Sequence, residues 1–205
     1  MPCWHLECFQ GRFLCQHGKD FGSLGGFLCR VGSQIAPVGV FGANTANCNS
    51  WKSVNFTAIM KVLFVCHGNI CRSPMAEFIL KALVKARGLE GLYHIESAAV
   101  SREEIGNPIY PPAKRCLSQH GVWFDPGKRA RQVTPEDYNR FDRIICMDGS
   151  NLRLIRRIIP EDPQGKIHLM MSYTGVGRDV ADPWYTGDFE ETFQDLLEGC
   201  EAMLG

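Results

Sequence analysis

The chain has little of two things that would direct a protein to nucleic acid or to a membrane. Its 205 residues carry 22 basic and 22 acidic side chains, so the formal net charge is zero. Proteins that bind nucleic acid or anionic lipid by general electrostatics carry a basic excess, which this chain lacks. No segment approaches the roughly 20 consecutive apolar residues that span a bilayer. We therefore expect neither nucleic acid nor a membrane among its partners.

The N-terminal part of the chain is poor in charge and in periodicity. Residues 1–59 contain eight glycines and five of the ten cysteines, but only six charged residues. Neither a helical nor an alternating pattern runs through them, and a glycine-rich aperiodic stretch is poor material for a core. We predict that residues 1–59 are an extension without a stable fold or outside the native fold, and that residues 60–205 form one domain. No basic start precedes an apolar core here, which disfavours a targeting peptide.

The sequence also lacks the paired cysteines of common metal sites. Five possible zinc ligands lie near the N-terminus, but their spacing matches no standard site: Cys3, His5, Cys8, Cys15 and His17. We predict no metal site, and zinc at these five residues is the open alternative.

One short window, residues 65–74, concentrates residues that carry chemistry. Its sequence is V-C-H-G-N-I-C-R-S-P, with an apolar run before it and a helical pattern after it. This order predicts a buried strand, a tight turn and a helix start, with Cys66 at the mouth of the turn. Cys66 is the only one of the ten cysteines with an arginine six positions later, Arg72.

The residue types in this window suit a site for a phosphoryl group. Gly68 and Asn69 tolerate the unusual backbone angles that point several N–H groups at one anion. The N-terminus of the following helix adds further N–H groups and a positive dipole end. Arg72 offers a planar fork for two phosphate oxygens, and the same positive field favours the nucleophilic thiolate of Cys66.

The two residues after Arg72 have an expected place at the start of the helix. Pro74 suits the first helical position, where no hydrogen bond is lost, and Ser73 then occupies the N-cap. From that position the Ser73 hydroxyl can also donate a hydrogen bond to the sulfur of Cys66.

Cleavage of a phosphate ester by a thiolate also needs a proton for the leaving oxygen. The best candidate donor is Asp182, which precedes Pro183 and two aromatic residues, Trp184 and Tyr185. The proline stiffens the backbone, and the rings would wall a slot for a flat aromatic substrate. Asp179 is a rival carboxylate in the same segment.

With these motifs, residues 60–205 resemble the low molecular weight protein tyrosine phosphatases along their whole length. Both motifs match, as do residues 96–98, 130–134 and 145–148. The resemblance implies hydrolysis of phosphotyrosine in proteins through a phosphocysteine intermediate. Cys66 would be the nucleophile, Arg72 would bind the phosphoryl group, and Asp182 would protonate the leaving oxygen and then activate water. It implies neither a metal nor an organic cofactor.

The resemblance also assigns supporting roles. The phosphate-binding loop would comprise His67, Gly68, Asn69, Ile70, Cys71 and Arg72. Hydrogen bonds from Asn69, Ser73 and Ser97 would hold this loop in shape. The substrate slot would be lined by Ile70, Glu103, Trp184 and Tyr185. Glu103 stands where many relatives carry an aromatic residue, which predicts one polar rim, and Lys128 replaces a histidine of some relatives at what we expect to be the surface.

Two other chemistries of this scaffold stay open. Phosphoarginine phosphatases typically carry threonine at position 70, so Ile70 favours phosphotyrosine. Thioredoxin-coupled arsenate reductases need a paired set of downstream cysteines, whereas those after the loop are far apart: Cys116, Cys146 and Cys200. A module that binds phosphate without cleaving it is disfavoured, because the thiol and the acid are both present. Cys71 would either trap an oxidised Cys66 as a disulfide or serve only as a small packing residue.

The remaining pattern predicts an α/β domain. Strands are expected at 61–66, 93–98, 143–147 and 166–169, helices at 74–87, 111–120, 151–159 and 189–204, and a capping box at Thr134. The alternation predicts a single doubly wound, four-stranded parallel sheet with helices on both faces and the phosphate loop after its first strand. Because a thiolate enzyme needs reducing conditions, we expect the protein in the cytoplasm. We also expect a monomer, and the resemblance implies that its partners are tyrosine-phosphorylated proteins.

Overall fold

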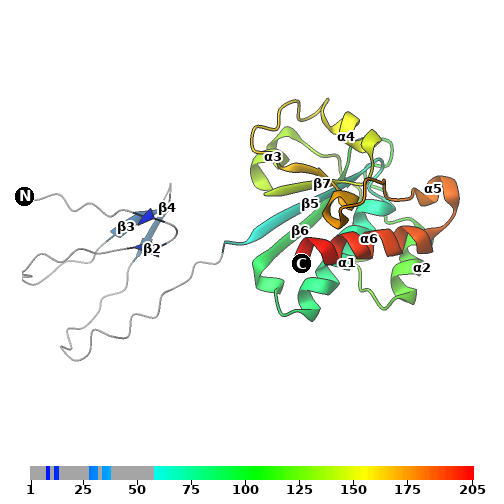
Figure 1. Ribbon diagram of the computed structural model, residues 1–205, viewed down its shortest axis with the longest axis horizontal. Helices are drawn as coiled ribbons and strands as arrows, with labels where there is room; N and C mark the ends of the chain where they lie inside the picture. Colours follow the sequence, from blue (N-terminus) through cyan, green and yellow to red (C-terminus); the bar gives the residue numbers. More distant parts are fainter. Residues whose placement is uncertain (1–7, 10–11, 14–27, 32–33, 38–57) are drawn as a thin grey trace, which may run out of the picture. The chain divides into compact units, whose positions relative to one another are not determined.

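The computed structural model describes residues 8–9, 12–13, 28–31, 34–37 and 58–205 (Figure 1). The chain divides after Val54 into two units. In the first unit, β1 (Cys8–Phe9) pairs with β2 (Arg12–Phe13) and β3 (Leu28–Val31) with β4 (Gln34–Pro37), both antiparallel. Four of the five candidate zinc ligands lie outside the described residues, and the predicted lack of a stable fold in residues 1–59 stays a prediction.

The second unit is built on one parallel sheet. Its strands are β5 (Met60–Cys66), β6 (Tyr93–Ala99), β7 (Arg143–Cys146) and β8 (Ile167–Leu169). They lie in the order β6-β5-β7-β8, and every pair is parallel. The predicted four-stranded parallel sheet is therefore confirmed, with each strand within two residues of its expected bounds.

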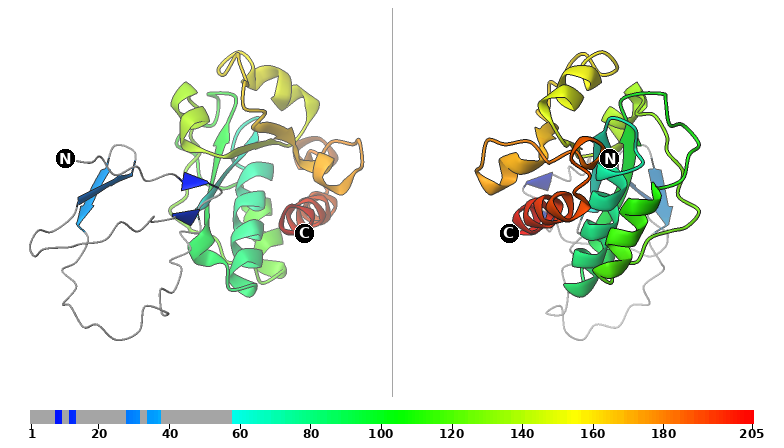
Figure 2. Two further views of the ribbon diagram at one scale, coloured as in Figure 1. Left: turned by 60° about the vertical axis from the view of Figure 1, so that its left-hand side comes forward. Right: turned by 90° about the vertical axis from the view of Figure 1, so that its right-hand side faces the viewer.

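Successive residues of the central strand β5 face opposite sides of the sheet, as a period of two requires. Val62 and Phe64 belong to a core that the sheet shares with α1 (Arg72–Ala86), α2 (Pro111–Gln119) and α6 (Phe189–Leu204). Leu63 and Val65 belong to a second core, on the side of α3 (Pro135–Arg140) and α4 (Gly149–Ile155). Figures 1 and 2 show these helices on the two faces of the sheet. The doubly wound α/β architecture is confirmed.

All four of these β5 side chains are fully buried, with an exposed fraction of 0%. Each contributes roughly 1.5–3 kcal/mol by leaving water, so the strand that carries Cys66 at its end is firmly held.

Three short helical turns complete the unit: η1 (Glu90–Leu92), η2 (Met170–Thr174) and α5 (Pro183–Thr186). Within the described residues, no helix is both long and apolar enough to cross a membrane.

Two predicted helix starts are wrong. Helix α1 begins at Arg72, with Cys71 as its N-cap, so Ser73 is not the cap and Pro74 is not the first residue. The buried Ser73 hydroxyl bonds side chains of the loop instead. Helix α4 begins at Gly149, because the Asp148 carboxylate caps it by accepting the N–H of Asn151. The helix ends at Ile155.

The capping box at Thr134 is confirmed. Its side chain accepts the N–H of Asp137, whose carboxylate accepts the N–H of Thr134 in return at 2.9 Å. This closes the start of α3 and fixes the loop of residues 128–134. Two backbone hydrogen bonds join that loop to Ala99. The N–H of Ala99 donates to the carbonyl of Arg131 at 2.7 Å, and the carbonyl of Ala99 accepts the N–H of Val133 at 2.9 Å.

Candidate active site

The loop between β5 and α1 carries most of the predicted site residues. Cys66 ends β5 at the carboxyl edge of the sheet, where open α/β sheets bind ligands. Asn69 has a φ of +58° and is the only residue other than glycine with a positive φ in the described part of the chain. This left-handed turn folds the loop back, and the N–H of Asn69 lies 3.2 Å from the Cys66 sulfur.

Gly68 serves the loop in another way than expected. Its φ is not in the left-handed region, so the sequence-based reason for a glycine here is wrong. A Cβ at this position would lie 3.0 Å from Cγ of Glu104. A side chain at position 68 would therefore crowd the side chain of Glu104, which packs directly on the loop.

The side chain of Asn69 is the centre of a buried hydrogen-bond network. Its Nδ2 donates to Oγ of Ser73 and to Oγ of Ser97, each at 2.8 Å. Its Oδ1 accepts the N–H of Arg131 at 3.2 Å. Oγ of Ser73 in turn lies 3.1 Å from the Cys66 sulfur. The three predicted supporting residues are thus in mutual contact beneath the loop.

Sequence reasoning missed the polar pair that anchors this network. Ser97 donates to the Glu77 carboxylate at 2.6 Å, and the Lys128 ammonium donates to the same oxygen at 2.7 Å. The side chains of Lys128 and Glu77 are only 15% and 4% exposed, so Lys128 is not the surface residue we expected. Lys128 approaches from a loop distant in sequence, and the only local signal was the spacing of Glu77 and Lys81 on one helix face.

Arg72 lies at the start of α1 and is almost fully buried. Its Nη1 donates to Oδ2 of Asp148 and its Nη2 to Oδ2 of Asp182, each at 2.5 Å. Burial alone would lower the pKa of Arg72, but the charges of Cys66, Asp182 and Asp148 outweigh burial and raise it. Sequence reasoning assigned no role to Asp148. Its place directly after the strand beside β5 was the available signal.

Asp182 reaches the loop from the far end of the chain. It caps the one-turn helix α5, and its Oδ1 accepts the N–H of Trp184 at 3.1 Å. Its side chain is 25% exposed and its other oxygen bonds Arg72. The rival Asp179 instead accepts the N–H of Gly149. Of these two carboxylates, only Asp182 lines the pocket.

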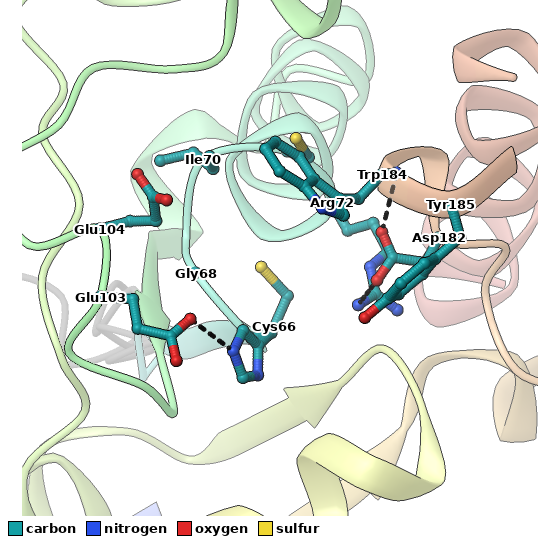
Figure 3. Close-up of a pocket in the computed structure, with 11 residues that line it drawn as sticks. Cys66, Gly68, Ile70, Arg72, Glu103, Glu104, Asp182, Trp184 and Tyr185 are labelled. Carbon is teal, nitrogen blue, oxygen red and sulfur yellow. Dashed lines mark hydrogen bonds and ion pairs between the residues drawn. The ribbon is translucent and has the colours of Figure 1, made fainter. Parts of the chain in front are cut away.

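These residues enclose a pocket of about 210 Å³ over the loop (Figure 3). It is lined by Cys66, His67, Gly68, Ile70, Cys71, Arg72, Glu103, Glu104, Asp182, Trp184 and Tyr185. The list includes every predicted slot residue and every predicted loop residue except Asn69, which lies buried behind the loop. Glu104 is the one lining residue that the sequence did not single out.

The two sides of the pocket mouth differ in character. Trp184 and Tyr185 form one side and are 60% and 85% exposed. The ring of Tyr110 supports Trp184 at a centroid distance of 5.6 Å. Figure 3 shows Glu103 and Glu104 on the opposite side. The pocket thus has one aromatic and one acidic rim, as the presence of Glu103 predicted for one side.

Cys71 lies in the pocket wall with a thiol that stays protonated. Burial, and next the negative charges of Cys66 and Asp182, raise its pKa to about 12. Because the thiolate is the nucleophilic form, Cys71 is a weak nucleophile near neutral pH. Cys71 therefore contributes a neutral thiol to the pocket wall.

One group outside the pocket has atoms that could hold a metal ion. Cys116, His120 and Glu190 bring one possible ligand atom each within 4.8 Å of one another, between α2 and α6. Each already has a partner within the protein. His120 bonds Glu190 at 2.8 Å and stacks on Phe193, and the Cys116 thiol donates to the carbonyl of Phe189. These contacts account for the cluster without an ion.

The chain is similar to known proteins over the whole of its second unit. A family model described as low molecular weight phosphotyrosine protein phosphatase matches residues 61–205. The low molecular weight protein-tyrosine-phosphatase YfkJ of Bacillus subtilis is 42% identical over 148 residues, which cover 71% of this chain and 94% of that protein.

Solved structures agree with the sequence matches. The crystal structure of YfkJ from Bacillus subtilis has a TM-score of 0.68 and covers 72% of this chain and 93% of that one. The structure of DARP, a drosophila arginine phosphatase, is 35% identical with a TM-score of 0.64, and covers 71% of this chain and 96% of that one. Since the family model matches well over half of its residues, the chain belongs to the low molecular weight phosphotyrosine protein phosphatase family.

Proposed function

We propose that this phosphatase hydrolyses phosphotyrosine in proteins through a phosphocysteine intermediate formed on Cys66. The observation that carries the proposal is the meeting of a thiol, a guanidinium and a carboxyl group in one small pocket, from Cys66, Arg72 and Asp182. Residues 60–205 make up the complete catalytic domain in this proposal. It needs no metal or organic cofactor, because the loop amides and Arg72 supply the positive charge.

In the first step the phosphoryl group enters the loop. Its oxygens accept hydrogen bonds from the N–H groups of the loop and from the guanidinium of Arg72. In the free protein this guanidinium donates to Asp182 and Asp148. The thiolate of Cys66 attacks phosphorus, so an S–P bond forms while the bond to the tyrosine oxygen breaks. Asp182 gives that oxygen its proton, and tyrosine leaves.

In the second step water replaces the protein sulfur. Asp182, now ionised, takes a proton from water as the water oxygen attacks phosphorus. The S–P bond breaks, its electron pair returns to the Cys66 thiolate, and inorganic phosphate leaves. One carboxyl group therefore acts first as acid and then as base, which restores the protein to its starting state.

The buried network determines how the thiolate is stabilised. Glu77 accepts hydrogen bonds only, so it directs the Ser97 hydroxyl toward itself. Ser97 then accepts from Asn69, and Asn69 also donates to Ser73. Oγ of Ser73 accepts from Asn69, and its single proton has two acceptors within reach, the Cys66 sulfur at 3.1 Å and the carbonyl oxygen of Ala98 at 3.3 Å. In this proposal the proton goes to the sulfur once Cys66 is a thiolate, because a thiolate can only accept. The ion pair of Glu77 and Lys128 sets the direction of the Ser97 bond.

The pocket favours an aromatic phosphoester as the substrate. Trp184 and Tyr185 provide flat apolar faces on one side, and Ile70 provides a branched apolar one. An apolar residue at position 70 offers no hydrogen bond to a guanidinium. Phosphoarginine is the second candidate, because an arginine phosphatase is among the similar structures. Faster turnover of phosphoarginine than of phosphotyrosine would contradict the proposed substrate.

Thiol-dependent arsenate reduction has less support. It needs a second thiolate that can reach the first. Burial raises the pKa of Cys116 to about 11 and that of Cys146 to about 12, and Cys200 is fully buried with a raised pKa as well. These three thiols lie on α2, β7 and α6 and stay protonated.

We further propose that the phosphatase acts as a monomer in the cytoplasm, where thiols stay reduced.

Replacement of the nucleophile tests the proposal most simply. We expect the wild type to release phosphate from a phosphotyrosine peptide without added metal, and Cys66→Ser to lower kcat by about 10³-fold or more. Cys116→Ser, a matched change outside the pocket, retains wild-type kcat. Absence of turnover by a folded wild type would instead favour arsenate as substrate, or phosphate binding without cleavage.

Replacement of the acid separates Asp182 from Asp179. Asp182→Asn lowers kcat/KM, which reports the step that releases tyrosine, by about 10²–10⁴-fold for a phosphotyrosine peptide, because the tyrosine oxygen leaves without a proton. The loss is smaller for an aryl phosphate whose phenoxide is stable by itself. Asp179→Asn is the control and keeps near-normal rates on both substrates. Equal losses for the two substrates in Asp182→Asn would argue against the acid role.

Replacement of Ser97 tests the buried network. Ser97→Ala removes one acceptor of Asn69 and lowers kcat by about 2- to 12-fold, the value of one buried hydrogen bond. The same change slows the alkylation of Cys66 by iodoacetamide, measured by mass spectrometry, because the network that holds Ser73 against the sulfur is weakened. Ser118→Ala, an exposed serine on α2, changes neither rate. Unchanged alkylation in Ser97→Ala would show that the network does not act on the sulfur.

A further inference from the structure

We infer that Glu103 and Glu104 form a subsite for a lysine or arginine side chain next to the phosphotyrosine of a substrate protein. The inference rests on the proposed function, since it names which phosphotyrosine proteins the pocket selects. It concerns the acidic rim, defined here as Glu103 and Glu104, which faces Asp182, Trp184 and Tyr185 across the pocket (Figure 3).

The acidic rim is held against the phosphate loop. The N–H of Ser101 donates to the carbonyl of His67 at 3.0 Å, which ties the rim segment to the loop. Glu104 packs on Gly68 so closely that a Cβ there would lie 3.0 Å from its Cγ. Asn107 donates to Oε2 of Glu104 at 2.6 Å. The rim segment and Glu104 therefore have a fixed place beside the phosphoryl site, and Glu103 precedes Glu104 in the same segment.

Both carboxylates keep room for a partner. Oε2 of Glu103 lies 3.1 Å from Nε2 of His67, and the Glu103 side chain is 73% exposed. Within the described residues, the hydrogen bonds of Glu103 and Glu104 use only Oε2 of each. A carboxylate can accept about four hydrogen bonds. Each can thus accept an ammonium or guanidinium N–H at the pocket mouth.

The charge of the pocket makes such a partner favourable. Glu103 and Glu104 place two carboxylates at its mouth, and the pocket contains one guanidinium, that of Arg72. Arg72 is already shared by Asp148 and Asp182. A peptide with acidic residues beside its phosphotyrosine brings further negative charge to the acidic rim, whereas a basic residue compensates that charge. The rim therefore selects for basic and against acidic neighbours of the phosphotyrosine.

The expected size of the selection follows from ordinary surface electrostatics. An exposed ion pair changes binding by up to about fivefold. The free energy of attraction for a basic peptide and that of repulsion for an acidic peptide add in the comparison of the two. We therefore expect kcat/KM for a peptide with arginine on both sides of the phosphotyrosine to exceed that for a peptide with glutamate on both sides by roughly tenfold. Added salt reduces this ratio, because the Debye length falls to about 3 Å at 1 M.

The test compares the two peptides on the full-length wild type and on the double variant Glu103→Gln/Glu104→Gln. We expect the roughly tenfold ratio to fall to near one in the double variant. Glu161→Gln, the same chemical change at an exposed residue between α4 and β8, keeps the wild-type ratio. A small aryl phosphate without flanking residues serves as the reference substrate for every variant.

Three outcomes would overturn the inference. A wild-type ratio near one, with good turnover of the aryl phosphate, means that the rim does not select. A ratio that persists in the double variant means that another group, such as the aromatic rim, recognises the arginine. Failure of the wild type to hydrolyse the aryl phosphate and both peptides overturns the proposed function itself, and the inference with it.

Discussion

The left-handed turn at Asn69 is the constraint on which the site depends. A residue with a side chain tolerates a φ of +58° only when its surroundings hold it there. The amide of Asn69 is bonded through both ends, by Ser73 and Ser97 on one side and by the backbone of Arg131 on the other. The side-chain bonds and the backbone angle therefore support each other, and together they curve the loop around the space beside the Cys66 sulfur.

Charge balance is the second constraint on the site. A buried guanidinium needs compensation, and Arg72 obtains it from Asp148 and Asp182. Asp148 caps helix α4, two residues after the end of β7, and its side chain is 15% exposed. Asp182 lies on a one-turn helix near the surface and is more exposed. The proposed mechanism uses this difference, because the phosphoryl group takes the place of Asp182 on Arg72, and the freed carboxylate takes up a proton from solvent before it serves as the acid.

The sequence predicted the sheet and the phosphate-binding loop from local patterns, whereas the assignment of Glu103, Trp184 and Tyr185 to the substrate slot came from the resemblance to the family. The apolar run before Cys66 indicated a buried strand, and the residues of the phosphate-binding loop are consecutive in the sequence, from Cys66 to Arg72. It failed where long-range packing decides. Gly68 packs against the side chain of Glu104, and Lys128 is paired with Glu77 across 51 positions of sequence. No local spacing encodes contacts of this kind.

The central claim is that phosphate passes through the sulfur of Cys66, and the most direct test is to trap that intermediate. Acid quenching of the full-length wild type during turnover of a phosphotyrosine peptide, followed by peptide mass spectrometry, should show the mass of one phosphoryl group on the peptide that contains Cys66. With an aryl phosphate whose phenoxide is stable by itself, Asp182→Asn should accumulate more of it than the wild type, because the intermediate still forms while water lacks its base. A phosphorylated residue other than Cys66, or turnover with no phosphorylated peptide in either protein, would contradict the account.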